Sequence, residues 1–269
     1  MIATLRGVRL GYDDQGRGVP VVFLHGFPHD RALWDAQREA LADRARCIVP
    51  DLRGFGTSEV TGPYSVDQYA DDIASLLEWL EIPSAVICGL SMGGYIAMAL
   101  WRRHPERVRG LVLCDTKATA DSAAAQATRN ELIALVERDG VDALVERQLP
   151  GMVGKSTRAL HPELVEQMAA MMRRQPAAGV IGALAALRDR PDSQSTLRSI
   201  TVPVLVLVGE EDVITPFSDA QAMVDLLPLT TPTRLEWITH AGHVPCVERP
   251  SAVTQVLADF LSMPSLSSL

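Results

Sequence analysis

The chain has 269 residues, of which 47% are hydrophobic, and it carries a formal net charge of −8. That length and apolar content suit one large buried core, or a core with an inserted unit. Nucleic acids and anionic membrane surfaces attract clustered Lys and Arg, so the acidic balance and the lack of a basic run argue against both as partners.

Three features of the sequence concern the compartment. Residues 1–14 lack the basic flank and the apolar stretch of a secretory signal peptide. The longest uncharged stretch, residues 84–100, is shorter than the about 20 residues that cross a bilayer, and glycines interrupt it. The four cysteines form no C-x-x-C pair, which favours free thiols in a reducing compartment. We therefore expect a cytoplasmic protein that does not span a membrane.

Short apolar runs alternate with helical patterns along the chain. Asp30 is the expected N-cap of one helix, and Ser65 with Gln68 forms the capping-box pattern that opens another. Strands that are apolar on both faces and alternate with helices predict a parallel sheet of the α/β class, covered on both sides. In chain order, the pattern predicts a hairpin over 2–13, a strand over 19–26, a helix over 31–43, a strand over 47–52, a helix over 65–80, a strand over 84–89, a helix over 92–104, strands over 108–116 and 202–212, a helix over 216–227, a strand over 233–240 and a helix over 250–261.

One region breaks this alternation. Residues 118–195 show a helical pattern rich in Ala, Leu, Met and Arg, with no convincing strand. An insertion of this kind between two strands commonly lies over an active site. We therefore expect a core domain made of residues 1–117 and 196–269, and a helical cap made of residues 118–195.

The segment Gly89-Leu90-Ser91-Met92-Gly93 fits the pattern G-x-S-x-G between an expected strand and an expected helix. On such a turn the backbone of the serine is strained, its hydroxyl is exposed, and small neighbours relieve the crowding. A crowded turn in the core would use the same glycines. The strand–turn–helix context favours the other interpretation, in which Ser91 is a nucleophile.

A serine hydroxyl becomes a good nucleophile only when an oriented base removes its proton. In this architecture the expected chain order is serine, acid, histidine. Asp212 follows an expected strand and His243 lies in the loop after the next one, so both belong at the sheet edge that holds Ser91. Asp115, at the end of an earlier strand, competes with Asp212 as the acid. Otherwise Asp115 would cap the start of the helical insertion.

His240 lies near the candidate base in the sequence. It ends the expected strand over 233–240, and we expect it to make a local hydrogen bond rather than to act as the base. Because His240 and His243 follow a strand instead of sharing one face of a helix, they do not have the placement of a metal-binding pair. We expect no metal and no cofactor.

Cleavage of an acyl bond also needs donors for the oxyanion that develops on the carbonyl oxygen. The segment His25-Gly26-Phe27-Pro28 follows an expected strand, where a backbone N–H can point toward the serine. The expected donors are the backbone N–H groups of Phe27 and Met92. A plain turn explains Gly26 and Pro28, but it does not explain His25.

These segments together resemble the α/β-hydrolase superfamily over nearly the whole chain. The matching segments are HGFPHDRALWDAQ, DLRGFGTSE, GLSMGGYIAMALWRRHPERVRGLVL, VPVLVLVGEED and AGHVPCVERP. The resemblance is greatest to small esterases, enol-lactonases and cofactor-free perhydrolases. It implies an eight-stranded, mostly parallel sheet flanked by helices, with a helical cap inserted after strand six. It also implies the roles given above to Ser91, Asp212, His243 and the two amides.

The nucleophile and the cap separate the chain from some members of that superfamily. Haloalkane dehalogenases and epoxide hydrolases resemble the chain in the HGFP segment, but they use aspartate as the nucleophile. Epoxide hydrolases also place tyrosines in the cap, whereas residues 118–195 contain no aromatic residue. The apolar side chains of the cap either pack its helices together, which is the expectation for any single one, or face the site. Those that face the site would form a pliable aliphatic wall, with Met152 and Leu144 as candidate substrate-binding residues.

Arginines of the cap leave the polarity of the substrate open. Arg129, Arg147, Arg173 and Arg174 are candidates for binding a dicarboxylate substrate. A solvated helix face explains these four residues equally well.

We expect a serine carboxylesterase whose partner is a small-molecule ester or lactone. Ser91 would attack the ester carbonyl, His243 would take its proton and later activate water, and Asp212 would orient His243. An enol-lactonase or a perhydrolase would use the same residues on a different substrate. A ligand sensor built on a hydrolase scaffold is the alternative of a different class.

Overall fold

The computed structural model describes residues 1–5 and 7–267. Residue 6 of the expected hairpin and residues 268–269 of the expected core domain lie outside the described residues. The strands are β1 (Ile2–Leu5), β2 (Val8–Gly16), β3 (Val19–Leu24), β4 (Ala45–Pro50), β5 (Ala85–Leu90), β6 (Val108–Cys114), β7 (Val204–Gly209) and β8 (Thr233–Ile238). The helices are η1 (Arg31–Trp34), α1 (Asp35–Leu41), α2 (Val66–Trp79), α3 (Met92–Arg103), η2 (Pro105–Arg107), α4 (Ala123–Met152), α5 (Lys155–Leu160), α6 (Pro162–Arg173), α7 (Ala177–Arg188), α8 (Gln194–Leu197), α9 (Phe217–Leu226), α10 (Pro245–Glu248), α11 (Pro250–Leu261) and α12 (Pro264–Ser267).

The eight strands form one sheet in the order β1-β2-β4-β3-β5-β6-β7-β8. β1 pairs antiparallel with β2, β2 pairs antiparallel with β4, and the remaining neighbours are parallel. Every residue of β5 and β7 is buried, which explains why their sequences are continuous apolar runs without alternation. The mostly parallel, eight-stranded sheet expected from the sequence is confirmed.

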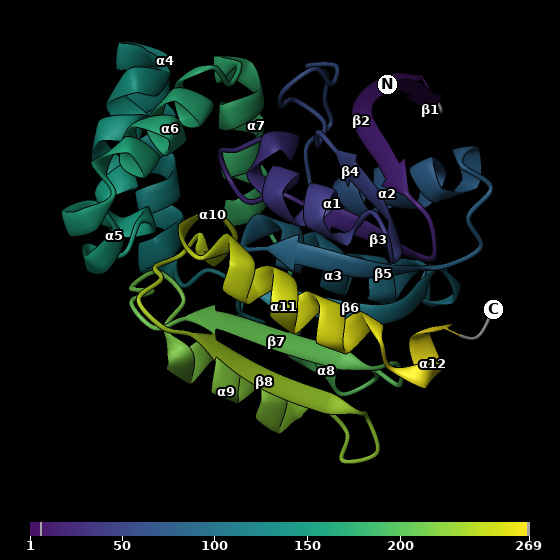
Figure 1. The fold of residues 1–269 in the computed structure, drawn as a ribbon. Helices are drawn as coiled ribbons and strands as arrows, with labels where there is room; N and C mark the ends of the chain where they lie inside the picture. Colours follow the sequence, from purple (N-terminus) through teal and green to yellow (C-terminus); the bar gives the residue numbers. More distant parts are fainter. Residues whose placement is uncertain (6, 268–269) are drawn as a thin grey trace.

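Helices cover both faces of this sheet (Figure 1). Successive strand residues point to opposite faces, so Val22 and Leu24 of β3 belong to one hydrophobic core and Val21 and Phe23 to the other. The first core contains side chains of α2, α3 and α9, and the second contains side chains of α1, α10 and α11. Two cores on one sheet hold its strand ends in fixed positions.

The insertion between β6 and β7 is helical, and α4 to α7 lie together beside the sheet (Figure 1). Gly140, with φ 82° and ψ −178°, interrupts α4 with a kink. The two ends of the insertion meet, because the Ser193 N–H donates to the Ala118 carbonyl at 2.8 Å. α8 packs against α3 and α9 of the core. The boundaries 118 and 195 of the cap stay a prediction.

A buried carboxylate docks the cap onto the core. Asp30 accepts hydrogen bonds from Arg174, through Nε and Nη2 at 2.6 Å each, and from Gln175 Nε2 at 2.8 Å. Gln175 Oε1 in turn accepts from the Gly56 N–H at 3.0 Å. Burial alone would raise the pKa of Asp30, but the hydrogen bonds from Arg174 and Gln175 and the Arg174 charge lower it overall. The segment between α6 and α7 is therefore fixed to the loops after β3 and β4.

Two local expectations need correction. The helix expected over 31–43 begins as the 3₁₀ turn η1, and α1 follows it only to Leu41; Asp30 does cap this start by accepting from the Ala32 N–H at 3.1 Å. Ser65 caps α2 by accepting from the Gln68 N–H, but the Gln68 side chain donates to Asp72 instead of closing the capping box. In the second place a contact one turn further along the same helix takes the side chain that the capping box would use.

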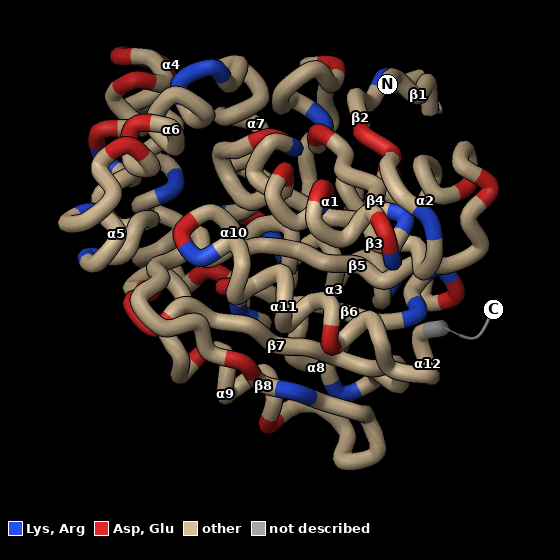
Figure 2. The backbone as a smooth tube through the Cα atoms, in the orientation of Figure 1, with Lys and Arg blue, Asp and Glu red and all other residues tan. Residues whose placement is uncertain are grey.

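Neither charges of one sign nor apolar residues are concentrated in one long segment of the described chain. Lys and Arg are interspersed with Asp and Glu along both the sheet region and α4 to α7 (Figure 2). None of the described helices combines the length and the apolar character that crossing a bilayer requires.

The contact between α7 and the loop after β4 yields a stability prediction. A Cβ at Gly179 would lie 1.9 Å from the Gly54 carbonyl oxygen, so Gly179→Ala must push two backbones apart. We expect this variant to lose about 1–3 kcal/mol of unfolding free energy. Gly151→Ala in α4 is the control, since a Cβ there meets nothing within 4 Å and alanine favours a helix. Denaturant unfolding followed by circular dichroism measures both, and equal stability of the two variants would contradict the expectation.

Candidate active site

Ser91 stands on a tight turn between β5 and α3. Its backbone has φ 52° and ψ −109°, a positive φ that is strained for a residue with a Cβ. A Cβ at Gly89 would lie 2.2 Å from the Gly93 carbonyl carbon, and one at Gly93 would lie 2.4 Å from the Leu24 carbonyl oxygen. The end of β5 is therefore in backbone contact with α3 at Gly89, and the start of α3 is in backbone contact with β3 at Gly93, which explains both glycines of the pattern. The serine side chain is left partly exposed.

The structure brings Ser91, His243 and Asp212 together in a line of hydrogen bonds. His243 Nε2 lies 2.9 Å from Ser91 Oγ, and His243 Nδ1 lies 2.8 Å from Asp212 Oδ2. Asp212 also accepts from the backbone N–H groups of Ile214 and Thr215 and from Thr215 Oγ1. Burial alone would raise the pKa of Asp212, but the charge of His243 and these hydrogen bonds lower it overall. Asp212 therefore stays ionised and holds the imidazole with Nε2 facing the serine.

A second carboxylate, Glu248, holds the loop that carries His243. Glu248 is buried and accepts from the backbone N–H groups of Gly154 and Gly242 at 2.8 Å each, and from that of Val244 at 3.4 Å. Glu248 does not stand out in the sequence, because its partner Gly154 lies 94 residues away. Its place in the ERP end of AGHVPCVERP is the sequence signal that would have found it.

The two residues expected to donate to an oxyanion lie in different elements, Phe27 in the segment after β3 and Met92 at the start of α3. Phe27 and Ser91 line the same cavity, and Met92 is the first residue of α3. Within the described residues, neither the Phe27 nor the Met92 amide N–H is used in a hydrogen bond. His25 explains how this segment is held, because its Nε2 accepts from the Leu52 N–H at 3.0 Å while its Nδ1 donates to the Gly26 carbonyl at 2.9 Å. Burial lowers the pKa of His25, which keeps the ring neutral in this role.

Asp115 does not cap the insertion, contrary to the alternative considered from the sequence. The cap of α4 is Ser122, whereas the Asp115 side chain is buried and its Oδ1 accepts from the Gly209 N–H at 2.8 Å. Its Oδ2 has no hydrogen-bond partner in the described part of the chain. Burial and the neighbouring charge of Asp212 raise the pKa of Asp115 well above its usual value. His243 bonds to Asp212, so Asp115 lies behind the acid and not in its place.

Asp115, Asp212 and His243 are also close enough to be tested as metal ligands. One donor atom from each lies within 4.8 Å of the others. Both ring nitrogens of His243 are already engaged, one by Asp212 and the other by Ser91 Oγ. This arrangement suits transfer of a proton from the serine and does not leave the imidazole free to bind an ion.

A cavity of about 270 Å³ opens onto Ser91 and His243 beneath the cap. Its lining consists of Phe27, Ser91, Tyr95, Arg129, Arg147, Gln148, Gly151, Met152, Leu187, Ile214 and His243. Met152 lies here as expected, but Leu144 is fully buried in the hydrophobic core and does not line the cavity. Half of the cap residues in the lining are polar, so the apolar side chains expected from the cap share this wall with polar ones. Met168 and Met172, two further methionines of the cap, are buried in the second core and do not line the cavity.

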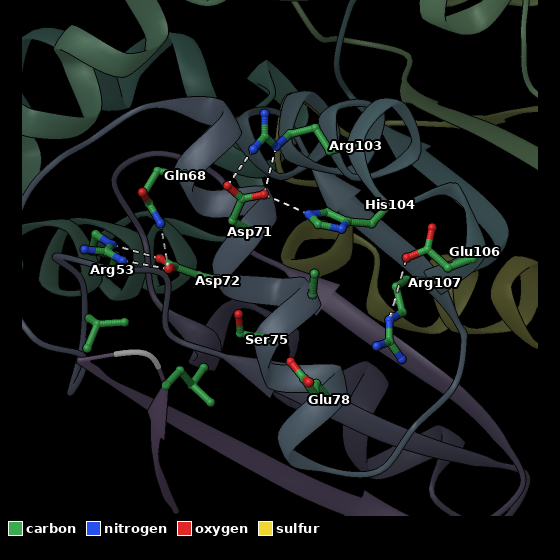
Figure 3. Close-up of a pocket in the computed structure, with 13 residues that line it drawn as sticks. Arg53, Gln68, Asp71, Asp72, Ser75, Glu78, Arg103, His104, Glu106 and Arg107 are labelled. Carbon is green, nitrogen blue, oxygen red and sulfur yellow. Dashed lines mark hydrogen bonds and ion pairs between the residues drawn. The ribbon is translucent and has the colours of Figure 1, made fainter.

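The hollow shown in Figure 3 is larger, at about 360 Å³, but it contains none of these residues. It lies between α2 and the segment from the end of α3 to η2, and its charged groups pair with one another. Arg53 donates to Asp72 at 2.6 Å, and Asp71 accepts from Arg103 and His104 at 2.7 and 2.8 Å. We therefore place the reaction in the cavity at Ser91.

Comparison with known proteins agrees with this fold and this geometry. The family model described as alpha/beta hydrolase fold matches residues 19–250. The chain belongs to the α/β-hydrolase family. Among curated relatives of this hydrolase, 3-oxoadipate enol-lactonase 2 of Acinetobacter baylyi is 30% identical over 93% of the chain and 91% of the relative.

Two solved structures extend the comparison. A thermophilic esterase from Thermogutta terrifontis, with malate bound, is 39% identical and superimposes on the hydrolase with a TM-score of 0.94, covering 100% of this chain and 99% of that one. The enol-lactonase from Burkholderia xenovorans is 26% identical with a TM-score of 0.90, covering 98% and 100%. Relatives with different names thus share the whole architecture of this chain.

The two buried aspartates give a first prediction for the site. Asp212→Asn presents an amide to His243 and favours the wrong tautomer, so we expect kcat on a short-chain ester to fall by about 10⁴-fold. Asp115→Asn keeps the acceptor for the Gly209 N–H and should remain active. Steady-state hydrolysis by the two variants measures this. An inactive Asp115→Asn beside an active Asp212→Asn would make Asp115 the acid.

The same Asp115→Asn variant also tests the protonation of that residue. A folded-state pKa above the unfolded value makes the native protein lose stability as the pH rises from the unfolded toward the folded pKa. The Asp115→Asn variant lacks this titrating group. Its unfolding free energy should therefore rise relative to that of the original protein as the pH increases through this range. Denaturant unfolding at several pH values checks the sign, and a constant difference would contradict it.

The two neighbouring histidines give the second prediction. His243→Gln removes the base and should lower kcat by orders of magnitude. His240→Gln should retain most activity, because the His240 side chain is 68% exposed and its backbone N–H, not its ring, bonds to Glu210. Similar losses in the two variants, measured on the same ester, would contradict this assignment.

Proposed function

We propose that this hydrolase cleaves small carboxylic esters through an acyl-enzyme on Ser91. The observation that carries the proposal is the 2.9 Å contact between Ser91 Oγ and His243 Nε2 at the wall of a cavity that admits a small molecule. A hydroxyl in this position is activated only when the base beside it is oriented, and Asp212 supplies that orientation.

In the first half of the reaction, Ser91 Oγ attacks the ester carbonyl carbon and passes its proton to His243 Nε2. The carbonyl electron pair moves to oxygen, where the amides of Phe27 and Met92 stabilise it by about 3 kcal/mol per donor. His243 then gives the proton to the departing alkoxide, and the alcohol leaves an acyl group on Ser91. In the second half, water attacks this acyl group, His243 takes its proton, and the carboxylic acid leaves as Ser91 Oγ regains a proton.

The cavity volume limits the acyl group. At about 270 Å³ the cavity is near the lower end of small-molecule sites, which supports short acyl chains over lipids. The Phe27 and Tyr95 rings and the Met152 and Leu187 side chains supply its apolar part.

A lactone is the second candidate substrate. Two full-length relatives named enol-lactonases, one curated and one of known structure, support it. The same residues would open a lactone by the same attack, with the leaving oxygen kept in the acyl group of the intermediate.

A substrate panel tests the proposal. The purified protein should hydrolyse ethyl and nitrophenyl esters of acetate and butyrate faster than a long-chain triglyceride, while Ser91→Ala retains the fold and loses turnover. An organophosphonate should label Ser91, as peptide mass spectrometry would detect. Faster opening of an enol-lactone than of any ester would favour the second candidate. Labelling of Ser91 without turnover on any substrate would favour a ligand sensor.

A further inference from the structure

The cavity at Ser91 has an unbalanced charge. Two of its lining residues are Arg129 and Arg147, and none of its described lining residues is Asp or Glu. The whole chain has the opposite balance, with a net charge of −8. The excess of arginine over carboxylate in this lining is therefore a local property of the cavity and does not follow from the composition of the chain.

Arg129 is held in place by a carboxylate that it shares with another arginine. Arg129 Nε donates to Asp121 Oδ2 at 3.1 Å, and Arg190 Nη1 donates to Asp121 Oδ1 at 2.6 Å. One carboxylate thus faces two guanidinium groups, which leaves one positive charge uncompensated. Arg190 also donates hydrogen bonds to the carbonyl oxygens of Leu187 and Thr119. The terminal nitrogens of Arg129 donate to no acceptor in the part of the chain that the structure describes.

Arg147 has only a weak partner. Its Nη2 lies 3.7 Å from Glu131 Oε2, and both side chains are more than half exposed. An exposed pair at this distance has little interaction energy and does not hold either side chain. Arg147 therefore remains available to a ligand in the cavity.

A neutral side chain in the same lining also lacks a partner. Gln148 lines the cavity, and its Oε1 is buried without a hydrogen bond from any described residue. Rotating the Gln148 side-chain amide by 180° exchanges Oε1 and Nε2. An N–H then lies at this point and can donate to an oxygen of a bound molecule. A carboxylate has the geometry to accept from a guanidinium and an amide together.

The other two arginines noted in the sequence, Arg173 and Arg174, have carboxylate partners elsewhere. Arg174 is engaged by Asp30, and Arg173 lies 3.0 Å from Glu166 and 3.7 Å from Asp142. Neither lines the cavity at Ser91. The structure thus divides the four arginines noted in the sequence into two that face the reaction and two that do not.

We propose that the hydrolase prefers esters that carry a free carboxylate a few bonds from the scissile carbonyl, which Arg129 and Arg147 bind under α4. This rests on the proposed function and names the substrate class of the same site. A monoester of a short dicarboxylic acid and a short acyl ester of a hydroxy acid both have this chemistry, with the carboxylate on the acyl side or on the alcohol side. The cavity volume of about 270 Å³ admits either.

Paired substrates test the preference. Monomethyl glutarate is compared with its neutral dimethyl ester for the acyl side, and the butyrate ester of β-hydroxypropionate with isopentyl butyrate for the alcohol side. We expect kcat/KM, measured by chromatography of the acid released, to favour the anionic member in at least one pair. A preference for the neutral member in both pairs would overturn the proposal.

Variants assign that preference to the arginines. Arg129→Gln and Arg147→Gln should each lower the ratio of anionic to neutral kcat/KM by about tenfold or more, the effect of losing a hydrogen bond to a charged group. Arg173→Gln is the matched control and should leave the ratio unchanged. If Arg129→Gln fails to fold because Asp121 loses a partner, Arg147→Gln decides alone. A ratio that neither variant lowers would overturn the proposal.

The neutral esters separate this test from that of the proposed function. Turnover of the neutral esters that Ser91→Ala abolishes supports the esterase, whatever the charge preference. Absence of turnover on all four esters would count against the esterase itself and against the preference with it.

Discussion

The backbone crossing of β5 and α3 is the constraint on which the site depends. Gly89 of the strand and Gly93 of the helix leave no room for a Cβ, so the chain must reverse direction at Ser91 within a single turn. The resulting positive φ is an energetic cost that the surrounding sheet offsets. Because β5 lies in the middle of the sheet, with cores on both faces, this strained turn has nowhere to relax.

The other side chains reach Ser91 from elements that the sheet holds in register. β7 and β8 run parallel to β5, so the loops that follow them bring Asp212 and His243 to the same edge. Buried polar contacts then fix each loop. Glu248 accepts from the backbone of Gly154 beside the loop that carries His243, and Thr215 donates to Asp212. His25 accepts from the Leu52 N–H and so joins the segment after β3 to the segment after β4. The geometry at the serine is thus set by hydrogen bonds to the backbone, more than by contacts among the reacting groups.

Local chemistry explains how much of this was predictable. Ser91 and Asp212 each follow an apolar strand, and His243 follows the half-buried strand β8. A parallel sheet places strand ends together, so the proximity of the three residues followed from the sequence pattern. The sheet and its order of elements followed for the same reason. His25 was noticed but not explained, because its partner Leu52 belongs to a different strand end. Glu248 was missed because one of its partners, Gly154, becomes its neighbour only after the cap has folded back.

The cap was the least predictable part, and side-chain direction is the reason. Leu144 and Met152 lie on the same long helix, yet one packs into the core and the other faces the cavity. Both residues follow the kink at Gly140, so the kink does not separate them, and the helical pattern alone does not reveal which side of this segment faces the serine. The same uncertainty applied to the four arginines, of which only two line the cavity.

The end of α4 is hydrogen-bonded directly to the loop that carries His243. The His243 N–H donates to the Met152 carbonyl at 2.9 Å, and Glu248 accepts from the Gly154 N–H. For protein engineering, the cap is therefore not an independent module. Exchanging this cap for the cap of another family member would change the position of the His243 imidazole as well as the shape of the pocket, unless residues 152–154 are kept. Divergence of specificity in such a chain is expected to proceed by side-chain replacement along α4 more readily than by replacement of the whole insertion.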